Sequence, residues 1–154
     1  MTVRVQEAGF DVSAEIEKLT GGNDSIGAIA TFIGKMRGDA HGRPLASMTL
    51  EHYPGMTEAE LESIEIEARQ RFHLTGSLIV HRVGTLHPGD AIVLVITCAS
   101  HRGDAFAACE FFMDYLKTRA PFWKKETGVD GSGQWVDARE TDESAAGRWL
   151  NDKE

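Results

Sequence analysis

The sequence predicts an α+β fold with a largely antiparallel sheet. Short runs of alternating or continuous apolar character are mixed with segments of helical spacing, without the strict strand-helix alternation of a parallel α/β fold. The most apolar run, Ala91 to Ala99, predicts a central strand. The 154 residues, of which 42% are hydrophobic, are enough for one domain that spans residues 1–154.

The first part of the chain is expected to form a short strand, a helix and two further strands. Alternation predicts the first strand around Val3 to Val5, and Asp11 is a suitable cap for a helix in which Val12, Ile16 and Leu19 share one face. The apolar pattern predicts the next two strands at Ile26 to Ile33 and Ser47 to Tyr53.

Two breaks in this pattern mark a loop and the start of a second helix. Gly38 to Pro44 contains two glycines, a proline and charges, and it is predicted to be a mobile loop. After Pro54-Gly55, Thr57 and Glu60 form a capping-box signature for a helix. The apolar stripe expected on that helix is Leu61, Ile64, Ala68 and Phe72.

The second half is expected to contain two strands, a long helix, a hairpin and a short terminal helix. The strands are Ser77 to Val83 and Ala91 to Ala99, joined by a turn at Leu86 to Asp90. Helical spacing of apolar residues is seen at Phe106, Cys109, Phe112, Met113 and Leu116, and Pro121 should stop that helix. The remaining elements are Phe122 to Glu126 paired with Gln134 to Val136 across Gly128 to Gly133, and a helix near Ser144 to Leu150.

The charge and composition exclude several classes of protein. A net charge of −8 argues against general nucleic-acid binding, which needs a basic surface. No run approaches the roughly 18 to 20 apolar residues of a membrane helix, and Met1 to Phe10 is charged where a secretory signal would be apolar. We therefore expect a cytoplasmic protein in which Cys98 and Cys109 are reduced core residues.

Three segments carry more polar residues than packing requires. Lys35-Met36-Arg37 follows a strand beside the predicted loop, and Ser100-His101-Arg102 lies where the central strand passes into a helix, whose N-terminus favours anions. The third segment, Leu116 to Lys125, has four bases and no acid, and its Lys117 and Lys124 bracket aromatic residues. Each segment is a candidate anion site or a solvated surface. His101 has no partner at metal-ligand spacing, so no metal site is expected.

Six motifs together resemble the large, catalytic subunit of molybdopterin synthase. They occur in that family's order and spacing, and the resemblance is strongest over residues 25–150. The motifs are TFIGKMR (31–37), LEHYPGMTEAEL (50–61), HRVGTLHPGD (81–90), SHRGDAF (100–106), MDYLKTRAPFWKKE (113–126) and WVDARE (135–140).

This resemblance implies both a fold and a reaction. The implied fold is an α/β hammerhead with a mainly antiparallel sheet and a small antiparallel β subdomain. The implied enzyme is a sulfurtransferase that moves sulfur from the C-terminal Gly-Gly thiocarboxylate of a small ubiquitin-like subunit onto cyclic pyranopterin monophosphate, forming the dithiolene of molybdopterin. The implied assembly is a homodimer flanked by two small subunits, and no metal or organic cofactor is implied.

The resemblance also implies roles for particular residues. Lys117 and Lys124 would be catalytic, with Lys117 either stabilising an oxyanion or transferring a proton. Phe32 and Met113 would line the channel for the partner's tail. Substrate binding would fall to Lys35, Met36, Arg37, His101, Arg102, Lys125, Glu126 and Arg139.

One geometric argument suggests that the site is shared between two subunits. If Arg102 and Lys117 lie on one helix, they are about 22 Å apart, too far for one small pocket. We therefore expect His101 and Arg102 of one subunit to face Lys117 and Lys124 of another. Two other functions stay open: a non-catalytic module that binds ubiquitin-like tails, and a pterin- or nucleotide-phosphate enzyme, although the chain lacks a glycine-rich phosphate loop.

Overall fold

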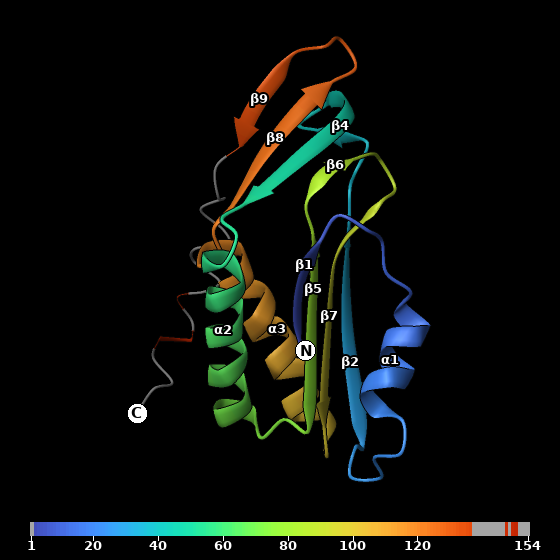
Figure 1. Cartoon of the computed structure of the whole chain (residues 1–154), viewed down its shortest axis with the longest axis vertical. Helices are drawn as coiled ribbons and strands as arrows, with labels where there is room; N and C mark the ends of the chain where they lie inside the picture. Colours follow the sequence, from blue (N-terminus) through green and yellow to red (C-terminus); the bar gives the residue numbers. More distant parts are fainter. Residues whose placement is uncertain (1, 137–146, 148, 151–154) are drawn as a thin grey trace.

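The computed structural model describes residues 2–136, 147, 149 and 150. In these residues the sheet that packs between the helices, called the larger sheet below, has the strand order β1-β5-β7-β2 (Figure 1). Strand β1 runs parallel to β5, and the other neighbouring strands are antiparallel. The bounds of these strands are Val3–Gln6 for β1, Ala28–Lys35 for β2, Gly76–Arg82 for β5 and Ala91–Ala99 for β7.

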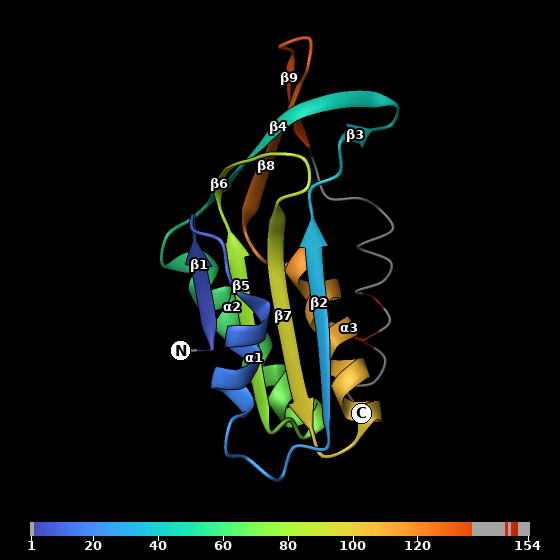
Figure 2. The ribbon, with the colours of Figure 1, turned by 90° about the vertical axis from the view of Figure 1, so that its right-hand side faces the viewer.

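Helices cover both faces of this sheet. Helix α1 (Val12–Thr20) lies on one face, and α2 (Met56–Phe72) and α3 (Arg102–Thr118) lie on the other (Figure 2). The interior strand β7 is therefore buried along most of its length, which explains why its sequence is almost continuously apolar rather than alternating. The predicted cap of α1 is confirmed, because the Asp11 carboxylate accepts a hydrogen bond from the Ala14 N–H at 3.0 Å.

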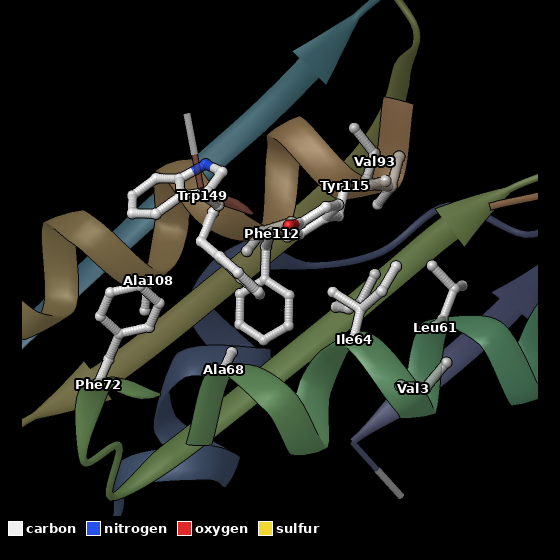
Figure 3. Packing of buried hydrophobic residues seen from close by; sticks show 14 residues of the cluster. Val3, Leu61, Ile64, Ala68, Phe72, Val93, Ala108, Phe112, Tyr115 and Trp149 are labelled. Atoms are coloured by element: carbon white, nitrogen blue, oxygen red, sulfur yellow. The ribbon is translucent and has the colours of Figure 1, made fainter. Parts of the chain in front are cut away.

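The largest core cluster joins α2 and α3 to the sheet. Phe72 of α2 and Phe111 of α3 meet edge to face with ring centroids 5.4 Å apart, and Trp149 packs against both rings. Figure 3 shows this packing from close by. The predicted stripe of α2 is confirmed, since Leu61, Ile64, Ala68 and Phe72 are all buried in this cluster (Figure 3).

A second sheet, antiparallel and with three strands of only two to four residues, stands at one end of the larger one and is called the smaller sheet below (Figures 1 and 2). In β4 the inward residues Met48 and Leu50 are buried, as their alternation predicts. The α+β fold with a small antiparallel β subdomain is thus confirmed. The strands of this sheet are β3 (Asp39–Ala40), β4 (Arg43–His52), β6 (Gly84–Leu86), β8 (Phe122–Gly128) and β9 (Gly133–Val136).

The prediction of a mobile loop at Gly38 to Pro44 was wrong. Asp39 and Ala40 form β3, which pairs with the start of β4 across a two-residue turn. The turn residues His41 and Gly42 have φ angles of 51° and 78°, the left-handed conformation that a tight hairpin turn requires. A histidine is an uncommon first residue for such a turn, so the sequence did not indicate the hairpin.

Three further predictions need correction. Helix α2 begins at Met56 rather than after Thr57, and its capping interaction joins the Gly55 N–H to the Glu58 carboxylate at 2.6 Å. Phe106 is 67% exposed and does not belong to the buried stripe of α3. Strand β6 was not predicted, and its last residue, Leu86, was assigned to the turn at Leu86 to Asp90; only three residues pair with β4, too few for an apolar pattern to indicate.

The remaining helix and strand boundaries agree closely with those predicted from the sequence. Strand β2 lies two residues later than predicted, and β8 pairs with β9 in the expected hairpin. Helix α3 ends at Thr118, shortly before Pro121. The helix predicted near Ser144 to Leu150 falls mostly outside the described residues. Among the described residues, no helix is both long and apolar enough to cross a membrane.

Candidate active site

A cavity of about 380 Å³ lies between the C-terminal end of α3 and the inner face of the smaller sheet. Four basic residues from three separate parts of the chain line it, together with two acidic residues and one histidine. Those seven residues are Lys35, Arg37, Lys117, Lys124, Asp39, Glu126 and His81. The apolar part of the wall is formed by residues that include Met36, Leu45, Met48, Leu50, Ile92, Leu116 and Phe122.

The end of β2 supplies Lys35 and Arg37. The pairing of β2 with β7 shifts register between Gly34 and Lys35. The buried Met36 is then held through its backbone: its N–H donates to the Asp90 carbonyl, and its carbonyl accepts from the Gly89 N–H, both at 2.9 Å. Because these two hydrogen bonds hold the backbone of Met36, they also restrain the backbone of Lys35 and Arg37, the basic residues on either side of it at the cavity.

The end of α3 supplies Lys117, and Arg119 anchors that end to α2. The Arg119 guanidinium donates to the Glu60 and Glu67 carboxylates, each at 3.0 Å, and lies over the Tyr115 ring at 4.9 Å. Lys117 is exposed to solvent in the free chain. The anchor therefore restrains the backbone that carries Lys117 at the wall of the cavity.

Strand β8 supplies Lys124 and Glu126. Lys124 is directly opposite Leu50 and Glu126 opposite Met48, so both acidic and basic side chains share the inward face of the sheet. Lys125 is opposite Thr49, on the outward face, and it is not among the residues that line the cavity. Alternation along one strand therefore separates two adjacent lysines onto opposite faces.

The start of β8 is tied to the start of α2 through Thr57. This side chain is fully buried; its hydroxyl accepts from the Tyr53 N–H at 2.9 Å and donates to the Pro121 carbonyl at 3.0 Å. Thr57 was assigned only a capping role from the sequence. Its observed contacts instead fix the short connection between the helix that carries Lys117 and the strand that carries Lys124.

His81 is a cavity residue to which the sequence analysis gave no role. It is 5% exposed and stacks on Phe122, with ring centroids 3.8 Å apart. Burial, followed by the charges of Lys117 and His52, lowers the pKa of His81 to about 4, against the opposing effect of a hydrogen bond to Arg82. The sequence signal that could have indicated this role was a histidine near the end of an otherwise apolar predicted strand. Burying a polar side chain costs free energy unless it is hydrogen-bonded, so such a residue suggests a specific function.

The other predicted site residues lie away from this cavity. His101 and Arg102 are exposed at the N-terminal end of α3, where His101 is the N-cap residue without a side-chain capping bond. Phe32 is 39% exposed on the edge strand β2, and Met113 packs against the largest core cluster. Neither is among the residues that line the cavity, and Arg139 lies outside the described residues.

The balance of charge in the cavity favours an anionic ligand. Four basic side chains face two acidic ones in a chain whose net charge is −8, so the positive charge is local rather than general. The described residues contain no group of three His, Cys, Asp or Glu side chains that could hold a metal ion. The fold and the cavity therefore define an α+β protein with a lysine- and arginine-lined site for a small anion.

The chain belongs to the MoaE protein family, whose profile matches residues 5–119. The molybdopterin synthase catalytic subunit of Ralstonia nicotianae is 57% identical over 148 residues, covering 96% of this chain and 84% of the relative. The molybdopterin biosynthesis MoaE protein from Burkholderia ambifaria superposes with a TM-score of 0.83 at 56% identity, covering 97% of both chains. For molybdopterin synthase from Staphylococcus aureus the TM-score is 0.79 at 30% identity, covering 86% of this chain and 94% of that one.

These comparisons confirm the family that the six sequence motifs indicated. The matched region contains the ends of β2 and α3 that supply Lys35, Arg37 and Lys117 to the cavity. The relatives extend over nearly the whole chain, so the small antiparallel sheet that completes the cavity belongs to the shared fold.

Proposed function

We propose that this chain is the catalytic subunit of a molybdopterin synthase. It transfers sulfur from the C-terminal thiocarboxylate of a small ubiquitin-like subunit to cyclic pyranopterin monophosphate, forming the dithiolene of molybdopterin. The names of its relatives support this assignment. The observation that carries it is the cavity in which Lys35, Arg37, Lys117 and Lys124 come together.

The charges of the two reactants match this cavity. A thiocarboxylate and a phosphate monoester are both anionic, and paired lysine and arginine donors bind such groups through charge-assisted hydrogen bonds. The apolar wall formed by Leu50, Leu116 and Phe122 excludes water from one side of the site, which strengthens each of these interactions. The same wall offers contact area to a flat pterin ring.

Lys117 is the residue that we assign to the sulfur-transfer centre. Its ammonium group stabilises the oxyanion that forms when the thiocarboxylate carbonyl is attacked, or it transfers a proton in the same step. Lys124 acts beside it from β8, and Arg37, Lys35 and Met36 bind the pterin substrate. Glu126 faces the same cavity and is suited to accept hydrogen bonds from the N–H groups of a pterin.

We propose further that a second copy of the chain completes the site. Arg102 and Lys117 lie on the single helix α3, about 22 Å apart along its axis. His101 and Arg102 therefore reach a Lys117 cavity only from another protomer, and we propose that Arg139 acts with them. In this assembly the homodimer carries two small subunits, whose tails enter past Phe32 and Met113.

Lys125 is the least supported of the proposed substrate ligands. It faces the outer side of the smaller sheet, opposite Thr49, so it takes part only if substrate or the partner subunit extends around the sheet edge. The proposal places the reaction in the cytoplasm, in keeping with the free thiols of Cys98 and Cys109.

A single-turnover assay tests the proposal. The protein is mixed with thiocarboxylated small subunit and cyclic pyranopterin monophosphate, and dithiolene product is measured for wild type, Lys117→Ala and the control Lys18→Ala. Lys18 is an exposed residue of α1, on the opposite face of the larger sheet. We expect Lys117→Ala to slow product formation by roughly 100-fold or more, the cost of removing one oxyanion donor, and Lys18→Ala to match wild type.

The main alternative is a non-catalytic module that binds ubiquitin-like tails in the same cavity. The same assay separates it from the proposed enzyme. Binding of the small subunit by wild type without any dithiolene product would favour the module and contradict the proposed function.

A further inference from the structure

A single buried hydroxyl joins three parts of the chain beside the cavity. The Thr57 hydroxyl, at the start of α2, donates to the Pro121 carbonyl at 3.0 Å and accepts from the Tyr53 N–H at 2.9 Å. The Thr57 N–H donates in turn to the Tyr53 carbonyl, also at 2.9 Å. The residue after β4, the start of α2 and the connection from α3 to β8 therefore meet at Thr57 (Figure 1).

The connection that Thr57 contacts is short. Helix α3 ends at Thr118 and strand β8 begins at Phe122, so only residues 119–121 lie between them. Lys117 directly precedes the last residue of the helix, and Lys124 is the third residue of the strand. A rotation within the connection therefore changes where these two lysines lie relative to each other. Proline has no N–H, so the carbonyl is the backbone group through which a hydrogen bond can hold residue 121.

Helix α2 holds both ends of this connection. Arg119, its first residue, donates to the Glu60 and Glu67 carboxylates. Pro121, its last residue, accepts from Thr57. The Arg119 side chain is 33% exposed, whereas Thr57 is fully buried. A buried hydroxyl cannot replace its partners with water as an exposed ion pair can, so Thr57 makes the more rigid of the two contacts.

We propose that Thr57 is a positioning residue whose hydroxyl sets the placement of Lys117 relative to Lys124. Thr57 is not among the residues that line the cavity, so it acts through the backbone of the connection. Its effect on sulfur transfer rests on the proposed function, whereas its structural role does not. Misplacement of a reacting group by about 1 Å can lower a rate as much as 100-fold, so a hydroxyl that holds the backbone between two lysines contributes to the rate.

Two substitutions separate the hydrogen bonds of Thr57 from its packing. Valine has the shape of threonine but no hydroxyl, so Thr57→Val removes the partner of the Tyr53 N–H and of the Pro121 carbonyl. Thr57→Ser keeps the hydroxyl and lacks only the methyl group. The matched control is Ser77→Ala. The Ser77 hydroxyl is also fully buried and donates at 2.8 Å to Glu65, which lies about 12 Å further along α2 than Thr57.

Amide hydrogen exchange measured by NMR tests the structural role without any substrate. The N–H groups of Arg119 and Phe122 donate to preceding backbone carbonyls at 2.7 and 2.9 Å, so their exchange rates report on the order of the connection. We expect both amides to exchange about tenfold faster in Thr57→Val than in wild type. In Thr57→Ser and in Ser77→Ala they should exchange within about twofold of the wild-type rate.

Exchange at the wild-type rate in Thr57→Val, or equally fast exchange in Ser77→Ala, would overturn the proposal. Wild type supplies a further test if Thr57→Val does not fold. The Tyr53 amide donates to the buried hydroxyl, so it should exchange at least about 100-fold more slowly than in an unstructured peptide. An unprotected Tyr53 amide would also overturn the proposal.

Kinetics of sulfur transfer test the catalytic consequence, at a temperature where urea unfolding shows that every variant is folded. We expect Thr57→Val to lower kcat about tenfold with KM nearly unchanged, and Thr57→Ser to recover most of that loss. Ser77→Ala should match wild type. Equal losses in Thr57→Val and Ser77→Ala would show that only general stability matters, and would overturn the positioning role. If wild type formed no dithiolene, the proposed function would fail, while hydrogen exchange would still decide whether Thr57 holds the connection.

Discussion

The two ends of α3 carry two of the three candidate anion-binding segments of the sequence, and their surroundings in the fold differ. At the C-terminal end, Arg119 ties the helix to α2, and the smaller sheet closes a cavity around Lys117. At the N-terminal end, His101 and Arg102 are exposed and line no part of that cavity. Basic side chains are therefore preorganised at the C-terminal end and exposed to another molecule at the N-terminal end, which is the arrangement expected of a site that two protomers share.

The largest effect should come from the inward face of β8. We expect Lys124→Ala to lower single-turnover sulfur transfer roughly 100-fold, because a charge-assisted donor is removed from a partly water-excluded site. Lys125→Ala removes the same charge from the outward face and should lower the rate by no more than about threefold, the scale of a screened surface charge. Equal losses in the two variants would mean that the cavity is not the site of reaction.

The second effect concerns acid stability at the Lys117 end. The pKa of His81 is about 4 in the folded chain and 6.5 for the unperturbed group, so between these values the unfolded state binds a proton that the folded state does not. Stability must therefore fall as the pH falls through this window, by about 2 kcal/mol between about pH 7 and pH 5. Urea unfolding of His81→Phe and His81→Gln should show a shallower fall in both variants, since neither side chain titrates. A slope equal to that of wild type would contradict the buried, neutral imidazole.

The smallest effect should come from the anchor of α3. Arg119→Met leaves Glu60 and Glu67 without their shared partner, and because the Arg119 side chain is 33% exposed, we expect a loss of about 1 kcal/mol in the free energy of unfolding. Arg102→Met, at the opposite end of the same helix, should leave the free energy of unfolding within about 0.5 kcal/mol of wild type. Thermal or urea unfolding of the pair measures the difference. A larger loss of unfolding free energy for Arg102→Met than for Arg119→Met would contradict the conclusion that the C-terminal end of α3 is the anchored one.

Much of the fold was predictable from local patterns. The stripe of α2 and the continuous apolar run of β7 each follow from a single periodicity, and the Asp11 cap follows from one side chain. The hairpin at His41-Gly42 and the short strand β6 could not be predicted from local patterns. The hairpin uses an uncommon turn residue, and β6 depends on pairing with a distant strand. Such pairing is decided by tertiary context rather than by propensity.

The site was predictable in its residue types and less so in its arrangement. The sequence indicated Lys35, Arg37, Lys117 and Lys124, and the fold brings these four together. Alternation along the predicted strand already separates Lys124 from Lys125, but only the pairing register with β4 shows that Lys124 faces inward and Lys125 outward. The sequence did not indicate His81, whose place in the cavity depends on contact between two sheets that are separated in the sequence.

Complementation between variants tests the shared site most directly. Arg102→Ala and Lys117→Ala proteins are mixed in equal amounts under conditions of confirmed subunit exchange, and sulfur transfer is measured. If His101 and Arg102 act on the cavity of the partner, half of the dimers are mixed and each contains one intact site, so activity should recover to about a quarter of wild type. A mixture of Lys117→Ala with Lys124→Ala, whose lesions share one cavity, should show no recovery. Activity of the first mixture that stays at the mean of its two parents would contradict a site built from both ends of α3.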